Sequence, residues 1–142
     1  MVKEALFKTF SSKLRRANDL SIGAEIENII YDKNFIRLPA NTGQVFSTPD
    51  LIARIDQINS YNDKNPSLTI EPGGQIECGS QPYAQLKWLD NEVKQYIKNL
   101  LIVAEEQNLI LSDFAIEPIQ HSNEIKIIKE KKYELMHKYF CE

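Results

Sequence analysis

Apolar residues recur at helical spacing in four parts of the chain, and this pattern predicts four helices. The helices are expected over residues 2–16, 48–58, from about 84 to 108, and 129–140. In the first helix the apolar residues Val2, Leu6, Phe10 and Leu14 would lie on one face.

Alternation with a period of two predicts strands between these helices. Leu20–Tyr31 and Phe35–Leu38 are separated by a turn-prone Asp-Lys-Asn sequence, so we expect them to form a hairpin. Leu68–Gly79 is predicted as one strand that is interrupted at its Pro-Gly-Gly sequence. Leu109–Ile119 is predicted as the last strand.

The order of these elements is typical of the α+β class, with helices packed on one face of a mostly antiparallel sheet. The other face would be polar. Glu25 and Glu27 share one face of their strand, and Gln75 and Glu77 share one face of theirs. The direction of Glu71 is left open because the Pro-Gly-Gly break lies between it and Gln75.

Composition indicates one globular domain. A chain of 142 residues can bury a core without disulfides, and its two cysteines form no disulfide framework. Cys78 has the parity opposite to Glu77 and is expected to pack inward. The formal net charge of -3 argues against a nucleic-acid partner. No signal peptide or membrane-spanning run is evident, so a cytoplasmic location without membrane attachment is expected.

Up to four carboxylates would meet on the polar face if the two acidic strands are neighbours. Such a cluster is repulsive unless a cation neutralises it, and Mg²⁺ is the natural partner for oxygen ligands. His121 and His137 are isolated, so nitrogen ligands are scarce. The chain has no GxxxxGK[ST] loop, so a nucleotide would bind through metal on the sheet. A solvated acidic strand face is the alternative.

Two motifs in these strands resemble signatures of the glutamate–cysteine ligase family of plant and proteobacterial type. Residues 22–27, IGAEIE, are similar to its IGxExE strand, and residues 70–77, IEPGGQIE, to its longer and more specific LEPGGQ(F/I)E signature. Residues 114–118, FAIEP, look like its strand ending in proline, and residues 132–140, KYELMHKYF, like its RYxxMxxY(M/F) segment. The resemblance extends from about residue 20 to the end.

The resemblance implies an ATP- and Mg²⁺-dependent ligase that joins the γ-carboxylate of glutamate to the amine of cysteine through γ-glutamyl phosphate, the first step of glutathione synthesis. It also implies part of a glutamine-synthetase-like catalytic domain. The implied metal ligands are Glu25, Glu27, Glu71 and Glu77. The implied catalytic residues are Glu71, Glu77 and Lys132, and the implied cofactor-binding residues are Gln75, Gly73 and Gly74.

The chain departs from the family pattern in three places. The family's LSGAP is replaced by residues 78–82, CGSQP, and Lys132 and His137 stand where arginines occur. Lysine lacks the bidentate grip of arginine on a carboxylate or phosphate. Family enzymes are also far longer, so residues 1–142 are expected to form a single, incomplete N-terminal domain.

Two alternatives to the ligase follow from these departures. One is a non-catalytic relative that keeps part of the metal and nucleotide site or serves as an interaction module. The other is a small α+β domain with an accidental acidic strand. An open sheet edge would favour self-association. The residues leave the acceptor open, as cysteine or another small amine.

Overall fold

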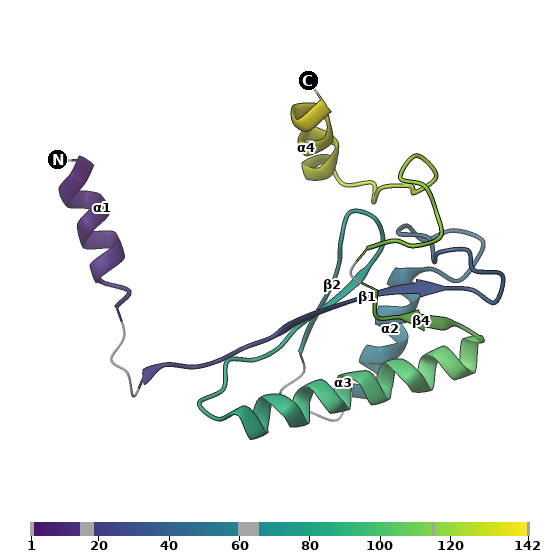
Figure 1. The fold of residues 1–142 in the computed structure, drawn as a ribbon, viewed down its shortest axis with the longest axis horizontal. Helices are drawn as coiled ribbons and strands as arrows, with labels where there is room; N and C mark the ends of the chain where they lie inside the picture. The colour runs from purple at the N-terminus through teal and green to yellow at the C-terminus, as the bar shows by residue number, and fades with distance from the viewer. Residues whose placement is uncertain (1, 15–18, 60–65, 115, 142) are drawn as a thin grey trace.

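The computed structural model describes residues 2–14, 19–59, 66–114 and 116–141. In chain order the described elements are α1 (Val2–Ser11), β1 (Glu25–Tyr31), α2 (Thr48–Asn59), β2 (Ser67–Ile70), β3 (Ile76–Gly79), α3 (Leu86–Gln107), β4 (Ile110–Ser112) and α4 (Lys131–Cys141). The strands form one antiparallel sheet in the order β2-β3-β1-β4 (Figure 1). This arrangement confirms the predicted α+β class.

The two acidic strands are direct neighbours at the centre of the sheet. β1 pairs with β3 so that Glu27 lies opposite Glu77 and Ile26 lies opposite Cys78. Cys78 is buried in the core, whereas Glu27 is exposed and Glu77 is half-buried. The period of two therefore places the carboxylates on one face and the apolar side chains on the other, as predicted.

The prediction of one interrupted strand over Leu68–Gly79 is wrong, because this segment is a hairpin of β2 and β3. The Glu71 N–H donates to the Gln75 carbonyl at 2.9 Å, and the Gly74 N–H donates to the Glu71 carbonyl at 2.8 Å. Gly74 has a φ of 88°. A residue with a Cβ rarely adopts this conformation, so the two glycines let the chain reverse where a bulge was expected.

The hairpin predicted from Leu20–Tyr31 and Phe35–Leu38 is reduced to one isolated bridge, between Tyr31 and Arg37. Phe35 has a φ of 61°, which a strand does not allow. The carboxylate of Asp32 accepts hydrogen bonds from two backbone N–H groups of the turn, at 2.8 and 2.9 Å. This local turn chemistry outweighs the tendency of the following residues to form a strand.

The outer ends of two other predicted strands also lie outside the sheet. β1 begins at Glu25, and the residues before it contribute only an isolated bridge between Ile22 and Tyr83. β4 keeps three residues of the predicted Leu109–Ile119 strand, and the chain then leaves the sheet. Within that predicted strand, residue 115 lies outside the described residues.

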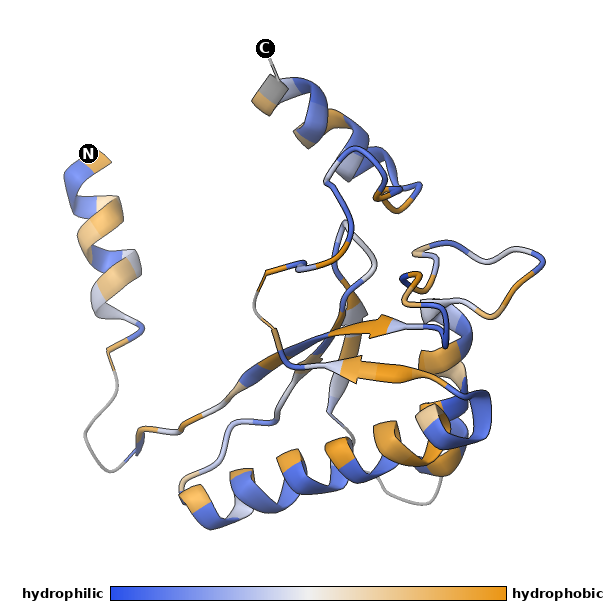
Figure 2. Ribbon diagram, turned by 45° about the vertical axis from the view of Figure 1, so that its right-hand side comes forward, coloured by the Kyte–Doolittle hydropathy of each residue, from blue (hydrophilic) through white to orange (hydrophobic). Residues whose placement is uncertain are grey.

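Helices α2 and α3 cover one face of the sheet (Figure 1). Figure 2 shows apolar residues on the side of α3 that faces the sheet and polar residues on its outer side. The buried core residues come from both layers and from the loop after β1: Ile30, Leu38, Leu51, Ile55, Ile76, Cys78, Tyr96, Leu100 and Val103. The prediction of helices on one face holds for α2 and α3.

The first predicted helix is present, but its apolar residues are exposed. α1 has no buried residue, and Val2, Leu6 and Phe10 are 75%, 52% and 71% exposed. Leu14 lies beyond the end of this helix, and residues 15 and 16 lie outside the described ranges. Periodicity identified the helix correctly, but burial also requires a partner surface.

Helix α2 is tied to the β2–β3 turn at its N-terminus. The Ser47 N–H donates to the carboxylate of Asp50 at 2.9 Å, and the Ser47 hydroxyl donates to the same carboxylate. The hydroxyl of Thr48 donates to the carbonyl of Gly74 at 3.0 Å. The turn is therefore held from the helical layer as well as from its own strands.

We predict that Gly74→Ala destabilises the protein by about 2 kcal/mol, from the strained φ and from crowding of a buried site. A Cβ at Gly74 would lie 3.2 Å from the Cβ of Ala40, which is buried. Chemical denaturation measures the loss. Gly43→Ala is the matched control, because no atom lies within 4 Å of its added Cβ. Equal effects of both substitutions would contradict the prediction.

Candidate functional site

Three side chains, here called the acidic row, lie across the face of the sheet that is turned away from α2 and α3. This face is here called the open face. Glu27 of β1 lies opposite Glu77 of β3, and Glu77 lies opposite Thr69 of β2. The Thr69 hydroxyl donates to Oε1 of Glu77 at 3.0 Å. Glu25 has the same parity on β1 and lies opposite Gly79. Thr69 was not among the predicted site residues, although the alternation of side chains in β2 places it on the same face as Glu77.

The structure places Glu71 on the open face as well. Its hydrogen bond to Gln75 continues the β2–β3 ladder, so Glu71 has the parity of the outward residues of β2. Burial raises the pKa of Glu71 above its usual value, and the negative charges of Glu77 and Glu27 raise it further. The cation of Lys132 acts in the opposite direction. The predicted carboxylates therefore interact electrostatically across this face.

Lys132 is the second residue of α4 and lines a cavity of about 520 Å³ together with Glu71. Its ammonium lies 3.5 Å from the carboxylate of Glu130 and 4.4 Å from the centre of the Tyr133 ring. A hydrogen bond to Tyr133, and then the charge of Glu130, raise the pKa of Lys132. The predicted cation thus lies beside the acidic row, although its direct contacts come from its own segment.

Arg37 is a buried cation that the sequence analysis missed. Its side chain is only 7% exposed. Nη2 donates to the carbonyl of Gly73 at 2.7 Å and to Oε1 of Gln75 at 2.9 Å. Oε1 of Gln75 is therefore already hydrogen-bonded to Arg37. The amide nitrogen of Gln75 is the part of this side chain that can donate to another group. Arg37 therefore orients the predicted residues Gly73 and Gln75 without belonging to a recognisable motif.

The charge of Arg37 is balanced by Glu117, whose Oε2 lies 3.2 Å from Nη1. Oε1 of Glu117 accepts hydrogen bonds from the Tyr31 hydroxyl at 2.8 Å and from the N–H groups of Ile119 and Gln120. Burial acts to raise the pKa of Glu117, but these hydrogen bonds and Arg37 outweigh it and the pKa is lowered. Burial and Glu117 raise the pKa of Tyr31 to about 12.

The segment after β4 folds over one end of the open face and encloses a cavity of about 390 Å³, here called the acidic cavity. Its lining residues are Glu25, Glu27, Ile29, Gln75, Asp113 and Phe114. Asp113 adds a carboxylate that the sequence analysis did not include. Ile29 shares the parity of Glu27 but is buried, which shows that the open face is covered at this end.

The carboxylate oxygens on the open face suit a hard cation such as Mg²⁺, whereas Oε1 of Gln75 already accepts a hydrogen bond from Arg37. Within the described ranges, however, no three His, Cys, Asp or Glu side chains stand close enough to hold one metal ion. One oxygen of Glu77 is engaged by Thr69. The open face of the described residues thus carries several carboxylates that are not gathered around one point.

Cys78 lies on the opposite side of the sheet from this row, as predicted. It is 2% exposed, and burial, together with the charges of Glu92 and Glu77, raises the pKa of its thiol to about 12. A thiol with this pKa is protonated at neutral pH and is a poor nucleophile.

Fold and site together define an α+β domain whose antiparallel sheet places Glu27 of β1 opposite Glu77, which belongs to the glycine-containing β2–β3 hairpin. No family model matches the chain. Among the described helices, none has the length and apolar character needed to cross a membrane.

Comparison with known proteins finds relatives that are all named glutamate–cysteine ligases. The chain is 24% identical over 148 residues to the chloroplastic glutamate–cysteine ligase of Arabidopsis thaliana, an alignment that includes 98% of this chain and 28% of that protein. The same identity and length hold for the chloroplastic ligases of Medicago truncatula and Brassica juncea. The chain spans less than a third of the length of these relatives.

We predict that Arg37→Met destabilises the protein by about 3–5 kcal/mol, because it leaves the buried carboxylate of Glu117 without its cation. Urea denaturation at pH 7 measures this loss. The matched control is Arg54→Met, which removes the exposed ion pair with Glu106 and is expected to cost less than about 1 kcal/mol. A loss at Arg37 no larger than at Arg54 would show that the buried pair is energetically unimportant.

We predict that Glu71→Gln stabilises the protein at pH 7 but has little effect at pH 4. The raised pKa of Glu71 means that ionising this group costs stability once the pH exceeds its folded-state pKa. Below the usual value of 4.5 the group is protonated in both states, so the amide replaces a neutral acid. Thermal melts at the two pH values test this, with Glu105→Gln on α3 as control. A loss of stability at pH 7 would reverse the sign we expect.

Proposed function

We propose that the chain is part of an ATP- and Mg²⁺-dependent ligase that joins the γ-carboxylate of glutamate to the amine of cysteine or another small amine. One observation carries this proposal: the hairpin of the EPGGQIE motif lies beside the IGAEIE strand, with Glu77 opposite Glu27. The proposal is supported by relatives named glutamate–cysteine ligase that align with 98% of the chain. Such an enzyme acts in glutathione biosynthesis.

In this proposal the open face holds the metal and the nucleotide phosphates. Glu25, Glu27, Glu71 and Glu77 would provide oxygen ligands. A bound Mg²⁺ would neutralise phosphate charge during phosphoryl transfer from ATP to the glutamate carboxylate. The amine would then displace phosphate from the resulting acyl phosphate. No protein nucleophile is required, which agrees with the buried, protonated Cys78.

The remaining predicted residues have supporting roles in this proposal. The amide nitrogen of Gln75, oriented by Arg37, would donate to a substrate or phosphate oxygen. Gly73 and Gly74 would let the nucleotide approach the backbone of the hairpin closely. Lys132 would add positive charge beside Glu71, with which it shares a cavity. A cytoplasmic location belongs to the same proposal.

Self-association is a further part of this proposal. β2 and β4 are the edge strands of the described sheet, and each is short and has no described strand paired on its outer side. Backbone N–H and C=O groups at such edges can pair with another chain. Pairing of two copies would extend the sheet that carries the acidic row.

We predict that the 142-residue chain releases ADP from ATP in the presence of Mg²⁺, glutamate and cysteine, and that a Glu71→Gln/Glu77→Gln variant loses this release by at least about 100-fold. The physical reason is that the variant removes two of the proposed ligands. A coupled ADP assay measures the rate, and light scattering on the same samples gives the mass of the active species.

The matched control is Asp56→Asn/Glu105→Gln, which removes two exposed carboxylates from α2 and α3. It should retain the wild-type rate. Folded wild-type protein that binds nucleotide only with Mg²⁺, but shows no turnover, would favour the non-catalytic relative. Folded protein that binds neither would refute a function in metal and nucleotide binding.

A further inference from the structure

A second cavity lies on the other side of the Arg37–Gln75 contact from the acidic cavity, and its volume is about 370 Å³. We call it the lysine pocket, because Lys126 and Lys129 line it together with Arg37, Leu38, Asn41 and Gly73. Gly73 lines this pocket and Gln75 lines the acidic cavity, and one nitrogen of Arg37 bonds to both residues. The two cavities therefore share one wall.

The pocket is formed by parts of the chain that are distant in sequence and are fixed together by hydrogen bonds. The Lys129 N–H donates to Oδ1 of Asn41 at 2.8 Å, and Nδ2 of Asn41 donates to the carbonyl of Ile127 at 3.3 Å. The Ile128 N–H donates to the carbonyl of Pro72 at 2.9 Å. Residues 124–129 are thus attached both to the loop after β1 and to the hairpin turn.

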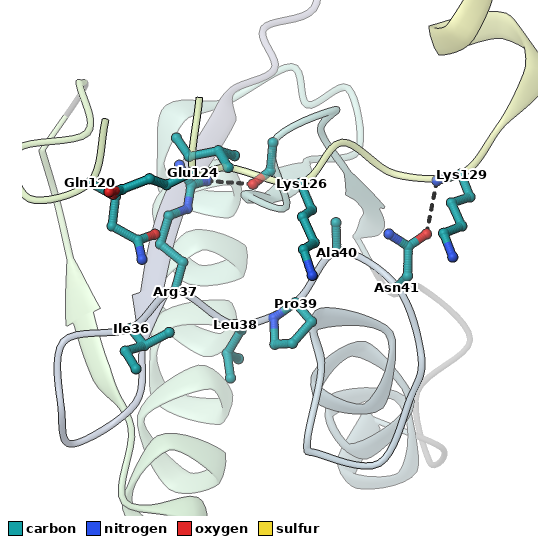
Figure 3. A pocket seen from close by; sticks show the side chains of 12 residues that line it. Ile36, Arg37, Leu38, Pro39, Ala40, Asn41, Gln120, Glu124, Lys126 and Lys129 are labelled. Carbon is teal, nitrogen blue, oxygen red and sulfur yellow. Dashed lines mark hydrogen bonds between the residues drawn. The ribbon is translucent and has the colours of Figure 1, made fainter. Parts of the chain in front are cut away.

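The charges around the pocket favour an anion. Figure 3 shows the side chains of Lys126 and Lys129 extending from their segment toward the loop that contains Pro39 and Asn41. Neither ammonium forms an ion pair with any described residue. The carboxylate of Glu124, which also lines the pocket, accepts a hydrogen bond from the backbone of His121 at 3.2 Å.

The inner wall of the pocket is apolar. Leu38 and Ala40 are buried, at 6% and 3% exposure, and Ile36 and Ile125 continue this surface. A cavity of a few hundred Å³ with apolar walls and a few convergent polar groups is typical of a small-molecule site. A free inorganic ion would leave these apolar walls unused.

We propose that the lysine pocket binds a small organic anion, with a phosphate or carboxylate group held by Lys126 and Lys129 and an apolar body against Leu38 and Ile36. Lysine ammonium groups bind both kinds of anion as point charges. This site is separate from the acidic cavity, whose carboxylates would repel the same ligand. The proposal goes beyond the ligase activity and does not depend on it.

The test uses the full chain and three probes that share a ring and differ in charge: phenyl phosphate, benzoate and benzyl alcohol. Titration followed by ¹H–¹⁵N NMR should shift the amides of Ala40, Gly73 and Lys129 with at least one of the two anions. Benzyl alcohol should bind at least about fivefold more weakly than that anion, because it lacks the charge. The comparison of the two anions identifies the preferred group.

Lys126→Gln/Lys129→Gln should weaken binding of the anion by about five- to tenfold, since two partly exposed ion pairs are lost. The matched control, Lys87→Gln/Lys98→Gln on α3, removes the same charge elsewhere and should leave affinity unchanged. If both variants weaken binding equally, the anion is attracted only by the overall charge of the protein and not by the lysine pocket, which would overturn the proposal. Absent shifts at the pocket amides, or equal binding of benzyl alcohol, would also overturn the proposal.

Discussion

The arrangement of the site depends on the interactions of one buried guanidinium, that of Arg37. One buried cation bonds to the carbonyl of Gly73 and to the side chain of Gln75, and its charge is balanced by Glu117. Removing a charge from water is costly unless its hydrogen bonds and its counter-charge are both provided. The hairpin turn, the end of β1 and the segment after β4 must therefore all be in place together. The acidic cavity and the lysine pocket form only when these three segments are in place.

The parts of the fold that were predicted correctly depend on short-range patterns. Alternation alone placed Glu25, Glu27, Gln75 and Glu77 outward and Cys78 inward, because the side chains of a strand alternate whatever surrounds it. The pairing of β1 with β3 was an assumption at that point. In the structure the Pro-Gly-Gly sequence forms a turn, so β2 lies beside β3. Glu77 is therefore the neighbour of Thr69 on one side and of Glu27 on the other.

The errors and omissions have a common physical origin in long-range contacts. Periodicity identified α1 but carries no information about whether a partner surface exists, and the apolar side chains of this helix are exposed. Arg37 and Glu117 were missed as a pair because no local pattern connects them, although Glu117 lies in the FAIEP segment. Asp113 was missed because it becomes relevant only where the chain leaves β4 and folds over the open face.

The separation of Tyr31 from Glu117, 86 positions along the chain, has a consequence for how the site assembles. The β2–β3 hairpin closes over only a few residues, so its loop-closure entropy is smaller by roughly 2–3 kcal/mol than that of the Tyr31–Glu117 contact. Chain entropy thus favours early formation of the hairpin and late arrival of residues 113–120. The hairpin carboxylates Glu71 and Glu77 would then be uncovered and open to ions in solution before residues 113–120 dock.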